Sequence, residues 1–162
     1  ISQIYEGTNG IQAIDLLGRK VLMDQGQKLR KFTKIVHKYC EANGGDSRLK
    51  DMAEAVSKLL KDVGDVTMHV GMQSMMNRDE AGAAATDYLR LIGHLTYAWL
   101  WARMAEVAYT KLDSASDDFY KAKIATARFY FAKLLPEVES LKATIKGGAK
   151  PLMSLEDEQF AF

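Results

Sequence analysis

The chain has 162 residues, enough for one domain with a proper hydrophobic core, or for one domain with a short appendage. Hydrophobic residues make up 48% and charged residues 27%, and the net charge of +1 gives no reason to expect nucleic acid or an anionic membrane as a partner. Cys40 is the single cysteine, which excludes an intrachain disulfide and agrees with a reducing, cytoplasmic location. The two prolines and the high content of Ala, Leu, Lys and Met predict an all-α protein. We expect an up-down helical bundle of about four long helices preceded by a short helix.

Residues 4–12 read Ile-Tyr-Glu-Gly-Thr-Asn-Gly-Ile-Gln and contain the candidate for chemistry. One carboxylate, Glu6, lies between Tyr5 and Gly7. Glycine permits backbone torsions closed to other residues and lets a ligand come close to the main chain.

A helix is expected to begin directly after this glutamate. Asn9 and Gln12 have the spacing of a capping box, and Thr8 is a second candidate cap, so the helix should run from about Gly10 to about Leu22. Its start offers unpaired N–H groups and a positive dipole end to an anionic ligand. The same residues also describe an ordinary loop-to-helix junction with an exposed glutamate. The apolar stripe expected to be buried is Ile11, Ile14, Leu17, Gly18 and Val21.

A second helix should start at Asp24, where the capping-box spacing recurs, and end at the Asn-Gly-Gly of residues 43–45, which tolerate left-handed backbone. Asp46 or Ser47 should cap a third helix that reaches about Arg78. An alternating spacing of four and three predicts its bundle seam: Leu49, Met52, Val56, Leu59, Val63, Val66 and Val70.

The third helix contains two glycines and a run of methionines. Gly64 and Gly71 are expected to allow close contact with neighbouring helices. A run of methionines near its end predicts either adaptable core or an interface with missing domains, with a ligand site as the alternative: Met68, Met72, Met75 and Met76.

A fourth helix is predicted from about Glu80 to about Lys111. It is apolar on almost all faces between residues 91 and 105, which indicates the central helix of a bundle, and its charged residues exclude a membrane span. Ser114 or Ser116 should cap a fifth helix, which Pro136 should kink or end. The stripe expected to be buried on it is Phe119, Ala122, Ala125, Phe129, Ala132 and Leu135.

Helical composition resumes from residue 137 to residue 146, and Gly147-Gly148 should stop that helix. The tail that follows is expected to form one short helix capped by Ser154. The tail residues expected to dock on the bundle are Leu152, Leu155 and Phe160.

Residues 4–20 closely resemble the C-terminal segment of acyl-CoA dehydrogenases. Residues 87–94, 101–105 and 125–130 look like the extra C-terminal helical domain of the larger bacterial members. The resemblance covers nearly the whole chain. It implies that residues 1–22 end the dehydrogenase's own helical domain, that residues 23–162 form the appended bundle, and that the chain is part of a longer protein.

The resemblance implies that Glu6 is the base that removes the α-proton of an acyl-CoA thioester while a hydride leaves the β-carbon for FAD. It places Tyr5 and Gly7 beside the substrate. It assigns FAD contacts to Thr8, Asn9 and Gly10. Many shorter members have Glu or Gln at the position of Gly10.

The intact enzyme would yield a 2,3-enoyl-CoA, pass electrons to an acceptor like electron-transfer flavoprotein, and form a homo-oligomer. The 162-residue chain alone is expected to be inactive and to hold no FAD tightly. The alternative is a non-catalytic helical bundle used for assembly or partner binding.

The remaining polar residues indicate no metal site, because the histidines are scattered and lack the spacing of ligand pairs on a helix. Asp65 and His69 lie four apart and should form a surface or half-buried pair. A set of polar residues on otherwise apolar helices either satisfies its own hydrogen bonds or marks a second functional site: Asp87, Arg90, His94, Arg103 and Arg128.

Overall fold

The computed structural model describes residues 8–113 and 117–160, and these ranges contain helices and no strand, which confirms the all-α prediction. In chain order the elements are α2 (Asn9–Ile14), the π-helical η1 (Asp15–Leu22), α3 (Gln27–Asn43), α4 (Lys50–Met76), α5 (Asp79–Leu112), α6 (Asp118–Phe129), the π-helical η2 (Tyr130–Leu134), α7 (Glu137–Lys146) and the 3₁₀ helix η3 (Asp157–Phe160).

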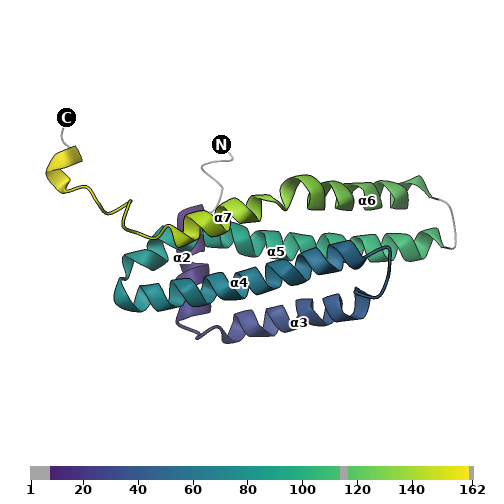
Figure 1. The fold of residues 1–162 in the computed structure, drawn as a ribbon, viewed down its shortest axis with the longest axis horizontal. Helices are drawn as coiled ribbons and strands as arrows, with labels where there is room; N and C mark the ends of the chain where they lie inside the picture. Colours follow the sequence, from purple (N-terminus) through teal and green to yellow (C-terminus); the bar gives the residue numbers. More distant parts are fainter. Residues whose placement is uncertain (1–7, 114–116, 161–162) are drawn as a thin grey trace.

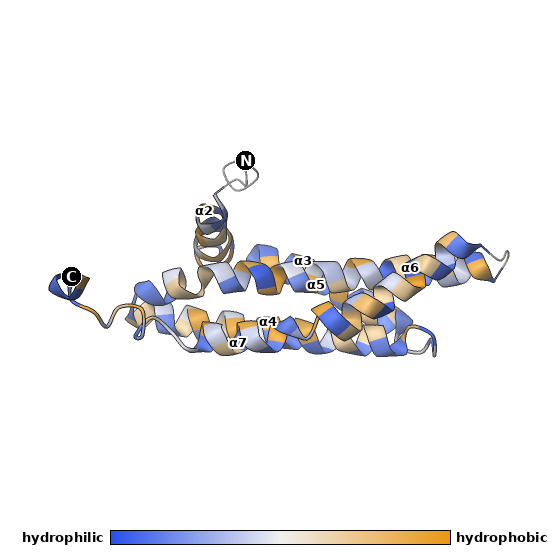
Figure 2. Ribbon diagram, turned by 90° about the horizontal axis from the view of Figure 1, so that it is seen from above, coloured by the Kyte–Doolittle hydropathy of each residue, from blue (hydrophilic) through white to orange (hydrophobic). Residues whose placement is uncertain are grey.

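The long helices lie side by side and alternate in direction, with α6, η2 and α7 together forming the last of them (Figure 1). Helices α4 and α5 form the central pair, with α3 on one flank and the α6–α7 rod on the other. Helix α2 and η1 run across one side of this bundle (Figures 1 and 2), where α2 packs on α5 and η1 packs on α3 and α5. The up-down bundle preceded by a short helix is therefore confirmed.

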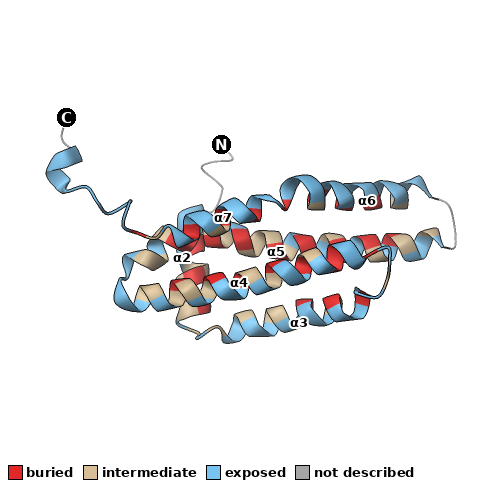
Figure 3. Cartoon of the chain, viewed as in Figure 1, coloured by how far each residue is buried: buried red, intermediate tan, exposed pale blue. Residues whose placement is uncertain are grey.

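The predicted seam of α4 is the centre of the core (Figure 3). All seven of its predicted members are buried: Leu49, Met52, Val56, Leu59, Val63, Val66 and Val70. Helix α5 faces them with Tyr88, Leu91 and Leu95 and with a series of alanines that let the neighbouring helices approach closely. It is not buried on all sides, however, because Tyr97 and Val107 are exposed.

Several helix starts differ from the prediction. Asn9 is the first residue of α2 and not its cap, and Thr8 before it takes a left-handed backbone (φ 59°) without a capping hydrogen bond from its side chain. Helix α3 begins at Gln27, later than expected. The backbone N–H of Gly26 still bonds the carbonyl of Val21 (2.8 Å), so the end of the preceding helix occupies these residues.

Aspartates do supply caps nearby. The Asp24 carboxylate accepts the N–H of Lys28 at 2.7 Å in the first turn of α3. Asp117 caps α6 by accepting the N–H of Phe119 at 2.8 Å, whereas the predicted caps Ser114 and Ser116 lie outside the described residues. Gly44 ends α3 with ordinary right-handed torsions (φ −65°), so the expected left-handed stop is absent there. Gly148, with φ 70°, provides the predicted stop after α7.

The stripe predicted for the fifth helix is wrong except at Leu135, which is buried, because its other members, including Phe119 and Phe129, are exposed and a different face of α6 is buried. The cause is the π-helical turn η2, where the N–H of Leu135 bonds the carbonyl of Tyr130, five residues back (2.9 Å). Pro136 follows directly and cannot continue the α-helical ladder, which accounts for the break. The buried face is Ile124, Ala127, Tyr130, Leu135, Val138, Leu141 and Ile145.

Two further surface predictions are corrected. The tail does not dock, and it extends away from the bundle (Figure 1) with its three apolar residues exposed: Leu152, Leu155 and Phe160. The methionines at the end of α4 are exposed, with Met75 at 90%, so the core interpretation is wrong and the interface with missing domains stays a prediction. A methyl group on Gly71 would touch Leu22, but one on Gly64 would meet nothing within 4 Å, so Gly71 alone supports the predicted close contact.

Candidate functional site

The candidate catalytic segment lies at the start of the arm formed by α2 and η1. Tyr5, Glu6 and Gly7 lie outside the described residues. Thr8, Asn9 and Gly10 lie at the start of α2 and are exposed, at one end of this arm, which packs across the side of the bundle (Figure 2).

The backbone around these residues is open to a ligand. The carbonyl of Thr8 accepts the first helical hydrogen bond, from the N–H of Gln12 (3.1 Å). A methyl group on Gly10 would meet nothing within 4 Å, so space is free on that side of the helix start. The described residues at the start of α2 are therefore exposed, with free space beside Gly10, and do not enclose a ligand.

The arm is anchored by one of its two apolar faces. Ala13, Leu17 and Val21 are buried and belong to the same core as the long helices. Ile11 and Ile14, which were also predicted to be buried, are 64% and 58% exposed on the opposite face. One face thus fixes the arm to α3 and α5, while the other is left uncovered.

An ion cluster stiffens the π-helical part of the arm. Asp15 pairs with Arg19, four residues on, and with Lys20 at 3.0 Å. Hydrogen bonds from these two cations lower the pKa of the Asp15 carboxyl to about 2. Asp15 is therefore a permanently charged anchor and not a proton acceptor at neutral pH.

A second polar cluster joins α5 to the η2–α7 junction. His94 Nδ1 lies 3.0 Å from the Tyr130 hydroxyl, and His94 Nε2 lies 3.0 Å from a Glu137 carboxylate oxygen. Arg90 forms an ion pair with the other oxygen of Glu137. A neutral imidazole with its hydrogen on Nε2 donates to the carboxylate and accepts from the phenol, whereas an imidazolium would donate to both. The Tyr130 hydroxyl also lies 3.2 Å from the backbone carbonyl of His94, to which it can donate.

Ionisation in this cluster follows from burial. Burial, with a smaller effect from Arg90, lowers the pKa of His94. Burial and then Tyr97 raise the pKa of Tyr130 to about 12. Both groups are neutral at pH 7 and have their hydrogen-bond partners inside the bundle, so the role of the cluster is to hold α5 against η2 and α7.

The other members of the predicted polar set lie elsewhere. Arg128 donates to the Tyr109 hydroxyl (2.9 Å), and the guanidinium of Arg103 lies 5.1 Å from the centre of the Trp99 ring. The set is therefore divided over separate contacts and forms no single second site. Across residues 8–113 and 117–160, no group of histidine, cysteine and acidic side chains could hold a metal ion.

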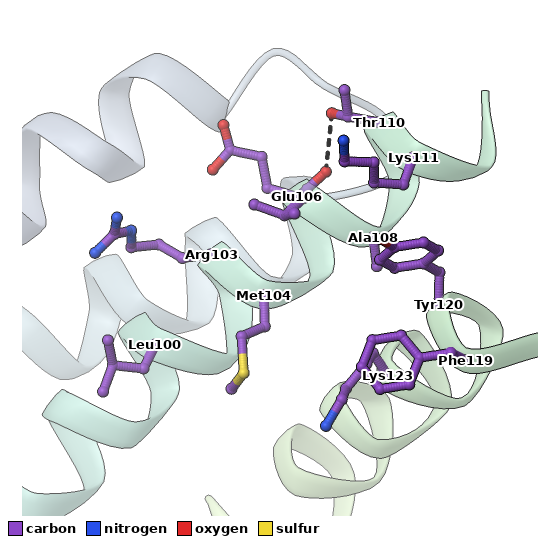
Figure 4. A pocket seen from close by; sticks show the side chains of 11 residues that line it. Leu100, Arg103, Met104, Glu106, Ala108, Thr110, Lys111, Phe119, Tyr120 and Lys123 are labelled. Atoms are coloured by element: carbon purple, nitrogen blue, oxygen red, sulfur yellow. Dashed lines mark hydrogen bonds between the residues drawn. The ribbon is translucent and has the colours of Figure 1, made fainter. Parts of the chain in front are cut away.

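One groove on the surface of the bundle was not anticipated from the sequence. A groove of about 780 Å³ lies between the second half of α5 and the start of α6 (Figure 4). Its apolar lining includes Leu100, Met104, Val107 and Phe119. Reasoning from the sequence missed it because Phe119 was assigned to the buried face of its helix.

No helix in the described part of the chain combines the length and the apolar character that a bilayer crossing requires.

Residues 32–156 match a protein-family model described as acetyl-CoA dehydrogenase C-terminal like. The chain is 28% identical over 170 residues to a broad-specificity linear acyl-CoA dehydrogenase of Mycobacterium tuberculosis, covering 99% of this chain and 28% of that protein. It is 30% identical over 156 residues to 3-methylmercaptopropionyl-CoA dehydrogenase of Ruegeria pomeroyi, covering 95% of this chain and 26% of that protein. A butyryl-CoA dehydrogenase of Syntrophomonas wolfei is 26% identical over 165 residues, covering 99% and 27%. The chain spans less than a third of the length of each relative.

Proposed function

Because this chain belongs to the acyl-CoA dehydrogenase family, as one of its C-terminal domains, we propose that it is the C-terminal part of an FAD-dependent enzyme. That enzyme oxidises an acyl-CoA thioester to the 2,3-enoyl-CoA. The observation that carries the proposal is the match of residues 32–156 to the family model, and the motif of residues 4–12 lies N-terminal to this region, separated from it by residues 13–31.

We assign the removal of the substrate's α-proton to Glu6. An unperturbed glutamate has a pKa of about 4.3 and is a poor base for a thioester α-proton. An apolar, water-free pocket raises a carboxyl pKa and so makes the residue a stronger base near neutral pH. The backbone N–H of Glu6 would donate to the thioester carbonyl and stabilise the negative charge that develops on its oxygen. Tyr5 and Gly7 would border the acyl group.

When bound, FAD supplies the redox chemistry by accepting the hydride from the β-carbon. Its proposed contacts in this chain are Thr8, Asn9 and Gly10. The accessible main chain and the free space beside Gly10 suit contact with one edge of such a group. Three exposed residues at the end of the arm do not enclose it, and the other walls would come from the rest of the protein. We therefore expect the 162-residue chain alone to be inactive and to hold no FAD tightly.

We also propose how the chain is divided between two domains of the intact protein. Residues 1–22 would complete the dehydrogenase's own helical domain, and residues 23–162 would form the appended bundle that holds the arm in place. A homo-oligomer, an acceptor similar to electron-transfer flavoprotein and a cytoplasmic location complete the proposal.

The proposal is tested by purifying the full-length protein and recording its flavin absorbance. Anaerobic addition of acyl-CoA thioesters of different length and branching should bleach the flavin band and form the corresponding enoyl-CoA. A full-length protein that is colourless, and stays so when offered FAD, would contradict the proposal. The alternative, a helical bundle for assembly or partner binding, would then account for the chain.

A further inference from the structure

The outward side of α3 is a basic surface. The charged residues of this helix are Lys28, Arg30, Lys31, Lys34, Lys38 and Glu41. Lys31, Lys34 and Lys38 follow one another at spacings of three and four, so they lie along one side of the helix, and all three are exposed. None of these three forms an ion pair with another residue in the described part of the chain. Lys31 acts only at longer range, as a minor influence that lowers the pKa of Asp24.

The same side of α3 contains an exposed apolar residue. Ile35 lies one turn after Lys31 and is 56% exposed. On the opposite side of the helix, Val36 and Cys40 are buried in the core, so the bundle does not use the surface formed by Ile35 and the lysines. Exposed ion pairs are individually weak, so a partner on this surface needs apolar contacts as well as acidic groups.

The C-terminal tail has the complementary composition. Glu156, Asp157 and Glu158 are consecutive and exposed, and their carboxylates form no ion pair within residues 8–113 and 117–160. Leu155 before them is 53% exposed, and Phe160 after them is 61% exposed. The tail is therefore acidic and apolar, as a partner for the basic and apolar surface of α3 must be.

The tail of each chain leads away from its own α3. It follows α7, which lies on the other side of the α4–α5 pair from α3 (Figure 1). The chain turns at Gly148 (φ 70°), where a methyl group would lie 2.9 Å from a Glu80 carboxylate oxygen, and the next residue, Ala149, is buried. This packed turn fixes the direction in which the tail leaves the bundle. The α3 surface that the tail can reach is consequently that of a second copy.

We propose that residues 152–160 of one copy of this chain dock on the outward side of α3 of a second copy. The acidic run lies against the three lysines, and Leu155 lies beside Ile35. A two-fold arrangement, in which each tail reaches α3 of the other copy, closes the contact. The inference rests on the proposed function for its second copy, since a homo-oligomer is part of that proposal, and it does not depend on the chemistry assigned to Glu6.

Disulfide trapping in the full-length protein tests this contact without reference to flavin. The test variant combines Leu155→Cys with Ile35→Cys, and the control combines Leu155→Cys with Glu54→Cys on α4, where the side chain of Glu54 is 67% exposed. Cys40, the native thiol, is buried and contributes little background. With copper phenanthroline as oxidant, we expect the test variant to form a disulfide-linked dimer at least about tenfold faster than the control, because docking raises the local concentration of one thiol beside the other. Equal rates would overturn the inference.

Exchange of charges tests the chemistry of the contact in the same variant. Lys31→Glu, Lys34→Glu and Lys38→Glu together should slow trapping to the control rate. Adding three further changes should restore it: Glu156→Lys, Asp157→Lys and Glu158→Lys. An unchanged rate after the first set, or no recovery after the second, would overturn the inference.

Two other outcomes would also overturn it. One is a disulfide confined to a single chain, which would show that the tail docks on its own α3. The other is a dimer that Ile35→Cys alone forms equally fast, which would show that two α3 helices meet. A colourless protein that still gives the trapped dimer would reject the dehydrogenase proposal alone, and a flavin-containing, acyl-CoA-reducible protein without the dimer would reject this inference alone.

Discussion

Leu17 is predicted to hold the arm that carries the candidate catalytic segment. Its side chain is 0% exposed and packs in the core shared with the long helices. Leu17→Ala removes buried methyl groups and leaves a cavity, which costs about 2–5 kcal/mol in well-packed cores. We expect a loss at the lower end of this range, since the arm packs at the side of the bundle and its surroundings can partly collapse.

Ile14→Ala is the matched control, because Ile14 lies three residues away and is 58% exposed. It should change the free energy of unfolding by no more than about 0.5 kcal/mol. The assay is urea unfolding followed by helical circular dichroism, with hydrogen exchange of the amides of residues 13–22 as a local readout. Leu17→Ala should speed that local exchange, and Ile14→Ala should not. If both variants cost the same and exchange alike, the arm is not anchored as described.

Three further predictions concern the bundle. The Tyr88 hydroxyl lies 2.7 Å from Thr67 Oγ1, and a double-mutant cycle of Tyr88→Phe and Thr67→Val should give a coupling of about 0.5–1.5 kcal/mol, whereas no coupling would contradict this contact. Lys142 lies 2.7 Å from Asp62 and 2.8 Å from Glu139, so Lys142→Met should lower the free energy of unfolding by about 1–3 kcal/mol, and a neutral result would refute that value. The Lys142 cation contributes most to lowering the Glu139 pKa to about 2, from the usual 4.5. Stability from this pair is therefore present above about pH 4.5 and lost as the pH falls towards 2, and the difference between wild type and Lys142→Met in acid unfolding should shrink over that interval.

The sequence predicts the long helices well because the spacing of their apolar residues fits a helix and no other secondary structure. The seam from Leu49 to Val70 is buried throughout, and α5 ends within one residue of the predicted bounds, 80–111. In α4 one face is apolar and the opposite face is polar, so helical periodicity identifies the inward side. In α5 the length of the apolar segment identifies the helix, although several of its apolar residues are exposed.

Prediction failed where both faces of a helix are apolar. In α6 the stripe beginning at Phe119 and the one beginning at Ile124 have similar spacing, and only the π-helical turn before Pro136 aligns the second with Val138 and Leu141. In α2 the exposed Ile11 was assigned inward for the same reason. Periodicity alone cannot show which of two apolar faces is buried.

The candidate site was likewise predicted only in part from the sequence. The start of a helix close to Gly10 follows from local residue chemistry and is observed, although Asn9 is not its cap. The role of Glu6 comes from the family resemblance and stays a prediction, because Tyr5, Glu6 and Gly7 lie outside the described residues. A base for carbon-acid chemistry depends on a desolvated pocket, and a pocket built from distant segments leaves no local pattern.

The most direct test of the central claim is anaerobic flavin reduction in full-length Glu6→Gln, monitored by stopped-flow absorbance with a saturating acyl-CoA. Glutamine keeps the size of the side chain and removes the base. The account predicts that the variant retains bound flavin and that acyl-CoA reduces it at least about a hundredfold more slowly than in wild type. Reduction at the wild-type rate would show that another group removes the α-proton and would contradict the role assigned to Glu6.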